Sequence, residues 1–362
     1  MNHHSARSRN GRSTSTGRFI AGSLLFATIA GASTLALAER LATGYEKDRA
    51  FTVSLSSETA SETTRNEILM DGEPIDRGGR GFGGGERTST FEVEYTDTIM
   101  AAADGAPSRV KRTFDAVSGA TEMEGRDGPV ERSMESSFEG LTMILTRADD
   151  DTVEIEIEDG DAPDQERLEG HALELPLDGL LPEDEVEAGS EWEIDGEAFM
   201  DALGMGMQRK LVDRPERGGG ERGERGGRGG RGGRRGGQRG GGNGAAMLAG
   251  GDWNITATLT DETKDVDGIE CMVIKIEAEV DGSPESPERE GVSVDASFSG
   301  NFEGELLWCK SESRPVELSV EGTYELSTEM TRDSERGVFE MSRAEETTVE
   351  ITVSVAASEG GE

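Results

Sequence analysis

Runs in which every second residue is apolar recur along most of this chain, and they limit its fold more than any other feature. Two of them are "TSTFEVEYTDTIM" and "DTVEIEIED", and a third is "PVELSVEGTYELSTEM". A period of two is typical of β-strands that bury one face and expose the other to solvent. In the first and third runs, the side chains expected on the buried face are Phe91, Val93, Tyr95, Ile99, Val316, Leu318, Val320, Tyr324, Leu326 and Met330.

Turn residues separate these runs, as in "AADGAPS" and "DGDAPD", so successive strands are expected to pair antiparallel. Roughly ten to thirteen strands fit the chain, which is more than an open sheet usually holds without curling. The sequence therefore predicts a mainly all-β fold: a curved antiparallel β-meander that forms a half-open barrel or two curved sheets. One or two short helices are expected, one at 195–207 capped by Asp195 and one at 163–174, where a strand is the alternative.

The N-terminus indicates the compartment. Residues 1–18 contain four arginines and no acidic residue, and an apolar stretch at 19–38 follows and ends in "ALA". This order of a basic, an apolar and a small-residue region is typical of a secretory signal peptide, here residues 1–38. The alternative is an uncleaved anchor at 19–38, which would tether the chain to the inner membrane. Either way, the protein is expected to be exported, to the periplasm or the extracellular space.

An arginine- and glycine-rich run, "RPERGGGERGERGGRGGRGGRRGGQRG", lies near the middle of the chain. It contains no large apolar residue whose burial could offset the entropy lost on ordering, so residues 213–248 are predicted to be disordered. They divide the mature chain into a first β segment at 39–212, with the short helix at its end, and a second at 249–362. The pattern leaves open whether the two segments are separate domains or one sheet with a long insertion.

The charge balance narrows the choice of partners. The chain carries 75 acidic and 37 basic residues, a net charge of −38. Such a charge opposes binding to nucleic acid or to an anionic membrane surface, and it favours cations and basic partners. A membrane contact is therefore expected only through an uncleaved N-terminus. The sequence does not name the envelope ligand or protein that would be the partner, and it does not indicate the oligomeric state.

Few residues point to catalysis or to a cofactor. The mature part of the chain has a single histidine, His171, expected on the surface or in a strand, and no G-x-S-x-G motif occurs. No close pairing of cysteines or histidines suits zinc. Asp159, Asp161 and Asp164 in "EDGDAPDQE" are candidate calcium ligands, and the alternative is a solvated acidic turn. We therefore predict no catalytic residue and no cofactor, with calcium as the one open case.

The two cysteines, Cys271 and Cys309, could form one disulfide in an exported protein. Both lie on the acidic, solvated side of their expected strands, as a cross-strand bridge requires. A hairpin that turns near residue 286 would, however, place Cys271 opposite residue 301 and far from Cys309. A disulfide would need these strands to pair in another register or across a barrel seam.

The stretch "LPLDGLLPEDEVEAGSEWEI" contains Pro182, Val186, Gly189 and Trp192 in a P-x₃-V-x₂-G-x₂-W pattern, and Trp253 ends a partial second instance. The tryptophans are expected to begin strands with their indoles toward the core, after a glycine that permits the turn. The pattern resembles one in uncharacterised secreted bacterial β-rich proteins. This resemblance, over 180–331, implies a curved antiparallel sheet like that of the periplasmic lipoprotein-carrier half-barrels, with no assigned chemistry.

These observations favour an exported, non-enzymatic, acidic β-scaffold at the cell envelope. It would bind a lipid-like or apolar ligand in the concavity of its sheet, or a protein partner. The alternative for that apolar face is an ordinary core closed by the short helix. Two other functions stay open: a polyanion-binding protein that acts through the arginine-glycine run, and a carboxylate-dependent hydrolase.

Overall fold

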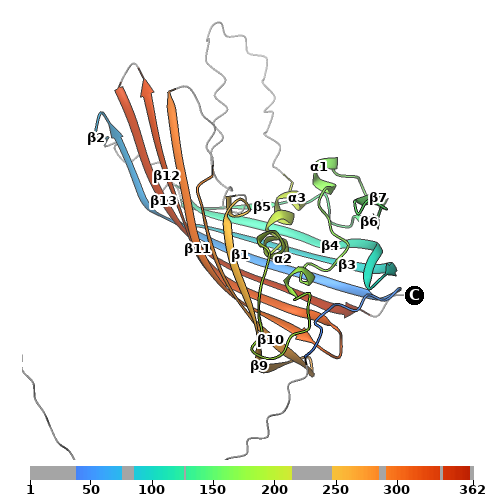
Figure 1. Cartoon of the computed structure of the whole chain (residues 1–362). Helices are drawn as coiled ribbons and strands as arrows, with labels where there is room; N and C mark the ends of the chain where they lie inside the picture. Colours follow the sequence, from blue (N-terminus) through green and yellow to red (C-terminus); the bar gives the residue numbers. More distant parts are fainter. Residues whose placement is uncertain are drawn as a thin grey trace, which may run out of the picture. The chain divides into compact units, whose positions relative to one another are not determined.

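The alternating runs pair antiparallel into one curved sheet of 13 strands (Figure 1). The computed structural model describes residues 38–75, 85–125, 128–213, 247–284, 291–334 and 337–358. The predicted signal peptide therefore lies outside the described residues except for Ala38. The strands are β1 (Ala50–Met70), β2 (Glu73–Pro74), β3 (Arg87–Ala103), β4 (Ala106–Gly125), β5 (Gly128–Met134), β6 (Thr142–Arg147), β7 (Val153–Asp159), β8 (Glu191–Glu193), β9 (Asp252–Val266), β10 (Ile269–Gly282), β11 (Val292–Cys309), β12 (Arg314–Ser334) and β13 (Gly337–Ser358).

Strands from both predicted β segments join this sheet. Their order is β7-β6-β4-β3-β1-β13-β12-β11-β10-β9-β8, with β2 beside β1 and β5 beside β4. The first and last long strands, β1 and β13, pair in the middle, from Ala50 opposite Ser358 to Met70 opposite Phe339. The meander thus grows outward in both directions from a central pair that unites the two segments.

Tight turns made of Asp-Gly pairs fix the register of three hairpins. Asp71-Gly72, Asp104-Gly105 and Asp267-Gly268 all have positive φ at both residues. A two-residue turn of this kind matches the right-handed twist of the strands it joins, and Asp-Gly adopts it readily because glycine has no Cβ to clash. The turn chemistry that the sequence displays therefore forms the hairpins β1–β2, β3–β4 and β9–β10.

A segment at residues 164–213, called here the covering segment, lies over one face of the sheet (Figure 1). It contains α1 (Gln165–Leu168), η1 (Asp178–Leu180), β8, α2 (Gly196–Ala202) and α3 (Met205–Leu211). As expected, the Asp195 side chain caps α2 by accepting from the backbone N–H groups of Glu197 and Ala198. Gly204, with φ of +64°, ends that helix, and a Cβ there would collide with Leu55 on β1.

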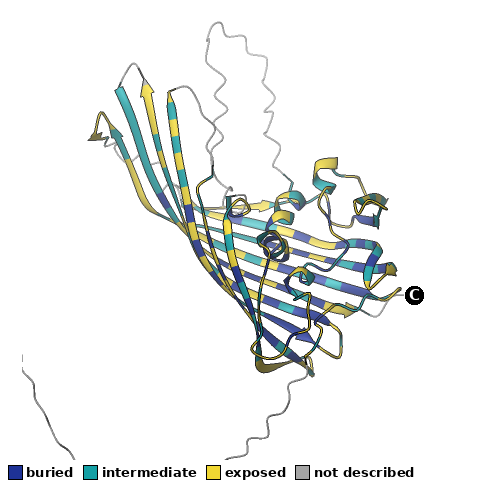
Figure 2. Ribbon diagram, in the orientation of Figure 1, coloured by how far each residue is buried: buried dark blue, intermediate teal, exposed yellow. Residues whose placement is uncertain are grey.

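The face beneath the covering segment, the inner face, is the core of the molecule (Figure 2). Phe91, Val93, Tyr95, Leu318 and Val320 are all buried there, packed with apolar side chains of α2 and α3. Beneath the covering segment, the apolar face is therefore a closed core rather than an open groove. Tyr324 and Leu326, farther along β12, are only partly buried.

One expected core residue faces the other way. The register between β11 and β12 shifts after Leu307, which leaves Val316 without a direct partner on β11. Val316 joins a second, smaller apolar cluster with Cys271, Val273, Leu307 and Cys309. The prediction that Val316 shares the face of Leu318 is wrong, because a bulge reverses the alternation at this point.

The outer face of the sheet carries a row of glutamates across five strands. Glu277 pairs with Glu303, which pairs with Glu321, and Glu321 pairs with Glu350, which pairs with Glu58. All are exposed. Like charges directly opposite each other on neighbouring strands disfavour the pairing, and they also repel a second sheet that would stack on this face. The outer face therefore opposes self-association.

The predicted disordered run at 213–248 lies outside the described residues except at its ends, where the prediction is wrong. Leu248 is buried in the core, and its carbonyl accepts from the indole N–H of Trp253 at 2.9 Å. At the other end, the backbone N–H of Asp213 donates to the carbonyl of Glu135 at 2.8 Å. Packing and hydrogen bonds thus hold both residues that flank the run.

Candidate functional site

Four strands continue past the covering segment as a strip that we call the wing (Figure 1). It consists of residues 62–70 of β1, 292–297 of β11, 326–334 of β12 and 337–345 of β13. In the part of the chain that the structure describes, no helix lies over this strip (Figure 1). Residues there are mostly half-buried or exposed, unlike those of the same strands nearer the core (Figure 2).

The inner face of the wing is apolar and rich in methionine. Cross-strand pairing aligns Val294 with Met330, Met330 with Met341, and Met341 with Ile68. Met70 and Phe339 pair in a neighbouring row, and Met70, at 38% exposed, is one of the two most exposed large apolar residues that the structure describes. In this row the inner face of the wing is therefore apolar, and no described helix covers it.

The outer face of the wing is polar. It includes Glu62, Arg65, Glu67, Asp295, Ser327, Glu329, Thr331, Glu340 and Ser342, which alternate with the apolar residues. The Arg65 guanidinium donates to the Ser327 hydroxyl at 3.3 Å, and both residues pair across Ala344, which is buried. The wing is thus an amphipathic strip whose two faces differ sharply in polarity.

On the inner face, a polar belt at the base of the wing and a small cleft lie between the core and the apolar row of the wing. The belt contains Arg343, which pairs with Glu345 at 2.8 Å, and Ser61, whose hydroxyl lies 3.0 Å from that of Thr347. The cleft has a volume of about 40 Å³. Its lining includes Leu55, Phe91, Met205, Leu248, Tyr324 and Ile351. Pockets for drug-sized or lipid-sized ligands are about ten times larger, so this cleft can take one small side chain at most.

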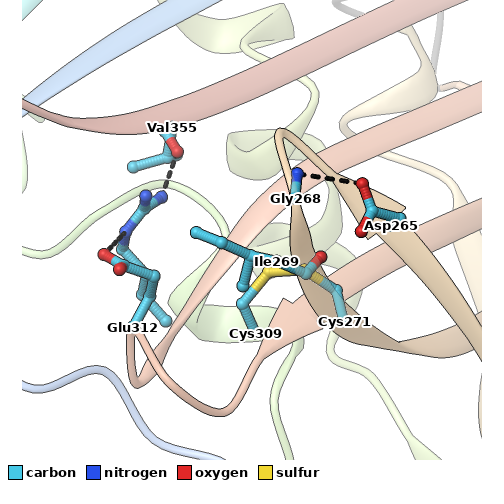
Figure 3. Close-up of a disulfide and its surroundings, with 8 residues drawn as sticks. Asp265, Gly268, Ile269, Cys271, Cys309, Glu312 and Val355 are labelled. Atoms are coloured by element: carbon cyan, nitrogen blue, oxygen red, sulfur yellow. Dashed lines mark hydrogen bonds and ion pairs between the residues drawn. A yellow bond between two sulfur atoms is a disulfide. The ribbon is translucent and has the colours of Figure 1, made fainter.

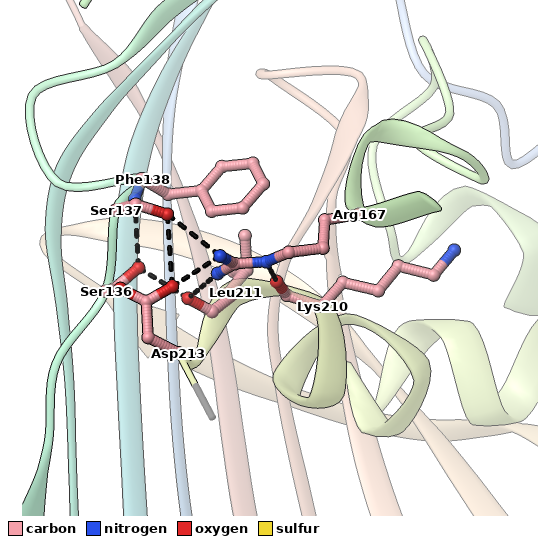
Figure 4. A network of polar contacts seen from close by, with 7 residues as sticks. All are labelled: Ser136, Ser137, Phe138, Arg167, Lys210, Leu211 and Asp213. Atoms are coloured by element: carbon pink, nitrogen blue, oxygen red, sulfur yellow. Dashed lines mark hydrogen bonds and ion pairs between the residues drawn. The ribbon is translucent and has the colours of Figure 1, made fainter. Parts of the chain in front are cut away.

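A larger hollow, of about 1390 Å³, lies beside α2 and α3. Eight carboxylates and three cations line it. On one rim the Arg167 guanidinium donates to the carbonyls of Lys210 and Leu211 and to the Ser137 hydroxyl, and it pairs with Asp213 (Figure 4). This network fastens the end of α3 to α1 and to the loop before β6. The hollow is open to the surface and mostly acidic, and nothing in its lining points to a particular ligand.

Buried charges hold the middle of the covering segment against the sheet. Arg112 on β4 binds both carboxylate oxygens of Asp97 on β3, each at 2.7 Å, and both side chains are at most 2% exposed. The same guanidinium donates to the carbonyl of Ala172 at 3.2 Å and lies over the ring of Tyr95. Asp97 was missed in the sequence, although it occupies the inner-facing position between Tyr95 and Ile99.

His171 is buried, so the expectation of a surface or strand residue is wrong. It lies in the loop after α1, 3% exposed, against the rings of Phe114 and Phe138, and neither ring nitrogen makes a hydrogen bond. A hydrolytic histidine needs a nucleophile and an acid within hydrogen-bond reach. Within the described ranges, His171 has neither. Burial, and then the charges on Arg112 and Lys210, lower the pKa of His171 to about 3.

This shift makes the protein sensitive to acid. We expect His171→Phe to lose less stability than the wild type between about pH 7 and pH 4.5, because an unfolded histidine takes up a proton near pH 6.5 and the folded one does not. Stability from neutral His171 is complete above pH 6.5 and falls as the pH drops toward 3. The difference should reach about 2–3 kcal/mol at pH 4.5, measured by urea unfolding at each pH.

The pKa of Asp178 shifts in the opposite direction, and its effect must be separated from that of His171. Burial raises its pKa to about 6, although Thr43 and Tyr45 donate to it. The folded state therefore holds its proton more tightly than the unfolded state, and its contribution declines as the pH rises through that range. Since both variants contain Asp178, its effect cancels in the comparison. Parallel pH profiles for His171→Phe and the wild type would contradict the assignment.

Cys271 and Cys309 form a disulfide, with their Cα atoms 4.1 Å apart (Figure 3). Met272 pairs with Trp308, so the cysteines lie one step further along the same hairpin, and the predicted register of Cys271 with residue 301 is wrong. The hairpin loop is asymmetric: β10 ends at Gly282, whereas β11 begins at Val292 and pairs back only from Phe298. The face was predicted correctly, but the second apolar cluster buries the cysteines there.

The residues of the P-x₃-V-x₂-G-x₂-W pattern lie in and just after the loop that leads to β8. Pro182 lies in that loop, Val186 bridges to the backbone of Glu39, and Gly189 has φ of +89° and donates to the carbonyl of Leu259. The Trp192 indole N–H donates to the carbonyl of Leu180 at 3.0 Å, and the Trp253 ring contacts Phe199 edge-to-face and Phe302 at a tilt. All these contacts are with the protein itself.

The candidate calcium ligands do not converge. Asp159, Asp161 and Asp164 are all exposed, and Asp159 accepts from the backbone N–H of Gly160. Among the described residues, no group of three histidine, cysteine or acidic side chains could hold a metal ion. This arrangement is that of a solvated acidic turn, the alternative considered for these residues.

No protein-family model matches the chain, and no curated protein matches it. Among solved structures, an outer membrane channel from Pseudomonas putida F1 aligns over 87% of this chain and 97% of that chain, at 6% sequence identity and a TM-score of 0.21. A TM-score this low carries no argument about fold or function. None of the described helices is both long and apolar enough to cross a membrane.

Proposed function

We propose that the protein is an exported, non-enzymatic β-scaffold of the cell envelope that binds a partner protein on the inner face of the wing. The observation that carries this proposal is the apolar row of Ile68, Met330 and Met341, which lies past the covering segment and beyond the polar belt. An apolar face on a strip without a packed cover is the usual mark of an interaction surface. Methionines suit such a surface because their flexible side chains adapt to the partner.

The shape of the site favours a protein over a lipid. A lipid-like ligand needs an enclosed pocket of several hundred Å³, whereas the cleft at the base of the wing measures about 40 Å³. A strip that is open along its length is buried by a segment that brings its own surface, as when an amphipathic helix or strand lies on an apolar groove. The lipid-carrier alternative is therefore the weaker one.

The other two functions have less support. Polyanion binding through the arginine-glycine run stays a prediction, because residues 214–246 lie outside those the structure describes. A carboxylate-dependent hydrolase also stays a prediction, and His171 does not support hydrolysis because phenylalanine rings enclose it.

A variant of the wing tests the proposal. We expect Met330→Lys/Met341→Lys to abolish the binding of a hydrophobic dye by the folded protein, because the two lysines lie in neighbouring strands at the centre of the apolar row. Thr331→Lys/Ser342→Lys is the matched control, since it adds the same charges to the same strands on the outer face. Dye fluorescence would be measured beside thermal unfolding of each variant.

Photocrosslinking in the producing cell extends this test to the partner. A photoreactive residue at position 330 should form crosslinks to a partner protein. The same photoreactive residue at position 331 should not form them. Equal dye binding by both lysine variants, or equal crosslinking from both positions, would rule out the inner face of the wing as the binding surface.

A further inference from the structure

We infer that the partner segment carries a carboxylate, which binds Arg87 while a neighbouring apolar side chain enters the cleft at the base of the wing. The inference rests on the proposed function and adds the chemistry of the partner. It comes from the charges of the inner face, which differ from those of the rest of the molecule.

Arg87 lies at the start of β3, where core and wing meet. It pairs with Ser61 of β1, so it shares the inner face with the apolar row. Its side chain is half-buried, its Nε atom is buried without a hydrogen-bond partner, and within the described part of the chain Arg87 makes no ion pair. In a chain with 75 acidic residues, a half-buried arginine without a carboxylate is unexpected.

Among the described inner-facing positions of the wing, no carboxylate is left for Arg87. Glu345 is the one acidic residue among the inner-facing positions of the wing, and Arg343 already pairs with it at 2.8 Å. Arg332 lies on the same face, opposite Phe339, so cations outnumber acids there. This excess of positive charge beside an apolar row complements a segment that is apolar and acidic.

The cleft lies within reach of the same arginine. Arg87 pairs with Ser61, whose hydroxyl lies 3.0 Å from that of Thr347. Thr347 in turn pairs with Tyr324, which lines the cleft. A planar guanidinium binds a carboxylate through two parallel hydrogen bonds, and such bonds are strongest where water is partly excluded. An acidic residue beside a small apolar anchor would therefore satisfy Arg87 and fill the cleft together.

The net charge of −38 does not cancel this preference. Charges separated by more than about 8 Å are largely screened at physiological ionic strength. The glutamate row lies on the outer face, so the sheet separates it from the site. The local charges of the inner face thus decide which segment binds, and the acidic body mainly slows the approach of an acidic partner.

A peptide-display selection on the full chain tests the inference. The probe is a library of random peptides of about twelve residues, long enough to cross the wing. Peptides that also bind Met330→Lys/Met341→Lys are discarded, which leaves those that need the wing. Among these, we expect Asp or Glu next to an apolar residue, and we expect Arg87→Gln to weaken their binding about tenfold, the usual effect of one charge-assisted hydrogen bond. The affinity of Arg87→Lys for these peptides should lie between those of the wild type and Arg87→Gln, because lysine keeps the charge but cannot form the two parallel hydrogen bonds.

The outcomes separate the two proposals. Wing-dependent peptides without an acidic preference, or with affinities that Arg87→Gln leaves unchanged, would overturn the inference and leave the proposed function standing. A selection that yields no wing-dependent peptide would overturn the proposed function as well. Thermal unfolding of each variant monitors the fold, and if Arg87→Gln does not fold, the comparison of Arg87→Lys with the wild type decides.

Discussion

Replacing Asp97 with alanine is expected to lower the free energy of unfolding by about 3–5 kcal/mol, one of the two largest effects of any substitution considered for this protein. The substitution leaves the Arg112 guanidinium in a dry site, where both partners are now at most 2% exposed. A buried charge without its partner costs far more than the pair itself contributes. Urea unfolding, followed by tryptophan fluorescence, measures the loss.

The matched control replaces both partners. Asp97→Leu/Arg112→Met fills the space with apolar side chains, and it should recover most of the loss because no unpaired charge remains. One donor to the carbonyl of Ala172 disappears with Arg112, so a cost of about 1–3 kcal/mol is expected to persist. If the double variant were as unstable as Asp97→Ala, the unpaired charge would not be the cause.

The same pair illustrates what the sequence reveals about the core. The alternation in "TSTFEVEYTDTIM" correctly predicts that Phe91, Val93, Tyr95 and Ile99 share a buried face. That pattern also places Asp97 on this face, between two buried residues, and Arg112 lies between Val110 and Phe114 in the same way. A charged residue that interrupts each of two apolar faces is a recognisable signal for a buried ion pair. What the pattern alone lacks is the pairing that sets Asp97 opposite Arg112.

Register explains most of the differences between expectation and structure. Alternation depends only on neighbouring residues along one strand. Register depends on where one strand ends and its partner begins. β10 ends at Gly282, opposite Phe298, whereas β11 already begins at Val292, and no sequence pattern reveals this offset. For the same reason, the alternating sequence predicts five exposed glutamates but not their alignment in one row.

The wing could be predicted only in part. The sequence correctly places Tyr324, Leu326 and Met330 on the apolar side of β12. Met341, the partner of Met330, lies on the next strand, but Ile68, which completes the row, lies far away in the chain. No local pattern indicates where the covering segment stops. The extent of the cover depends on the packing of α2 and α3, including the close approach of Gly204 to Leu55. An open apolar strip is therefore a property of the assembled sheet.

The second large effect concerns the disulfide. Cys271→Ala/Cys309→Ala is expected to lower the free energy of unfolding by about 4 kcal/mol, since the bond closes a loop with a sequence separation of 38 residues and so restricts the unfolded chain. Some further loss should come from the second apolar cluster, where both cysteines are buried. Urea unfolding of the variant and of the oxidised wild type measures the difference.

Reduced wild-type protein is the control that isolates the cross-link, because it keeps both sulfur atoms in the cluster. Its stability should lie between those of the oxidised wild type and the alanine variant, and equal stability of oxidised and reduced wild type would contradict the prediction. Because the cysteines are at most 1% exposed, a thiol reductant should reach them only when the hairpin opens. Reduction should therefore be slow in the native protein and accelerate with urea. A bond that contributes this much stability persists in an oxidising compartment, and this fits the export that the N-terminus predicts.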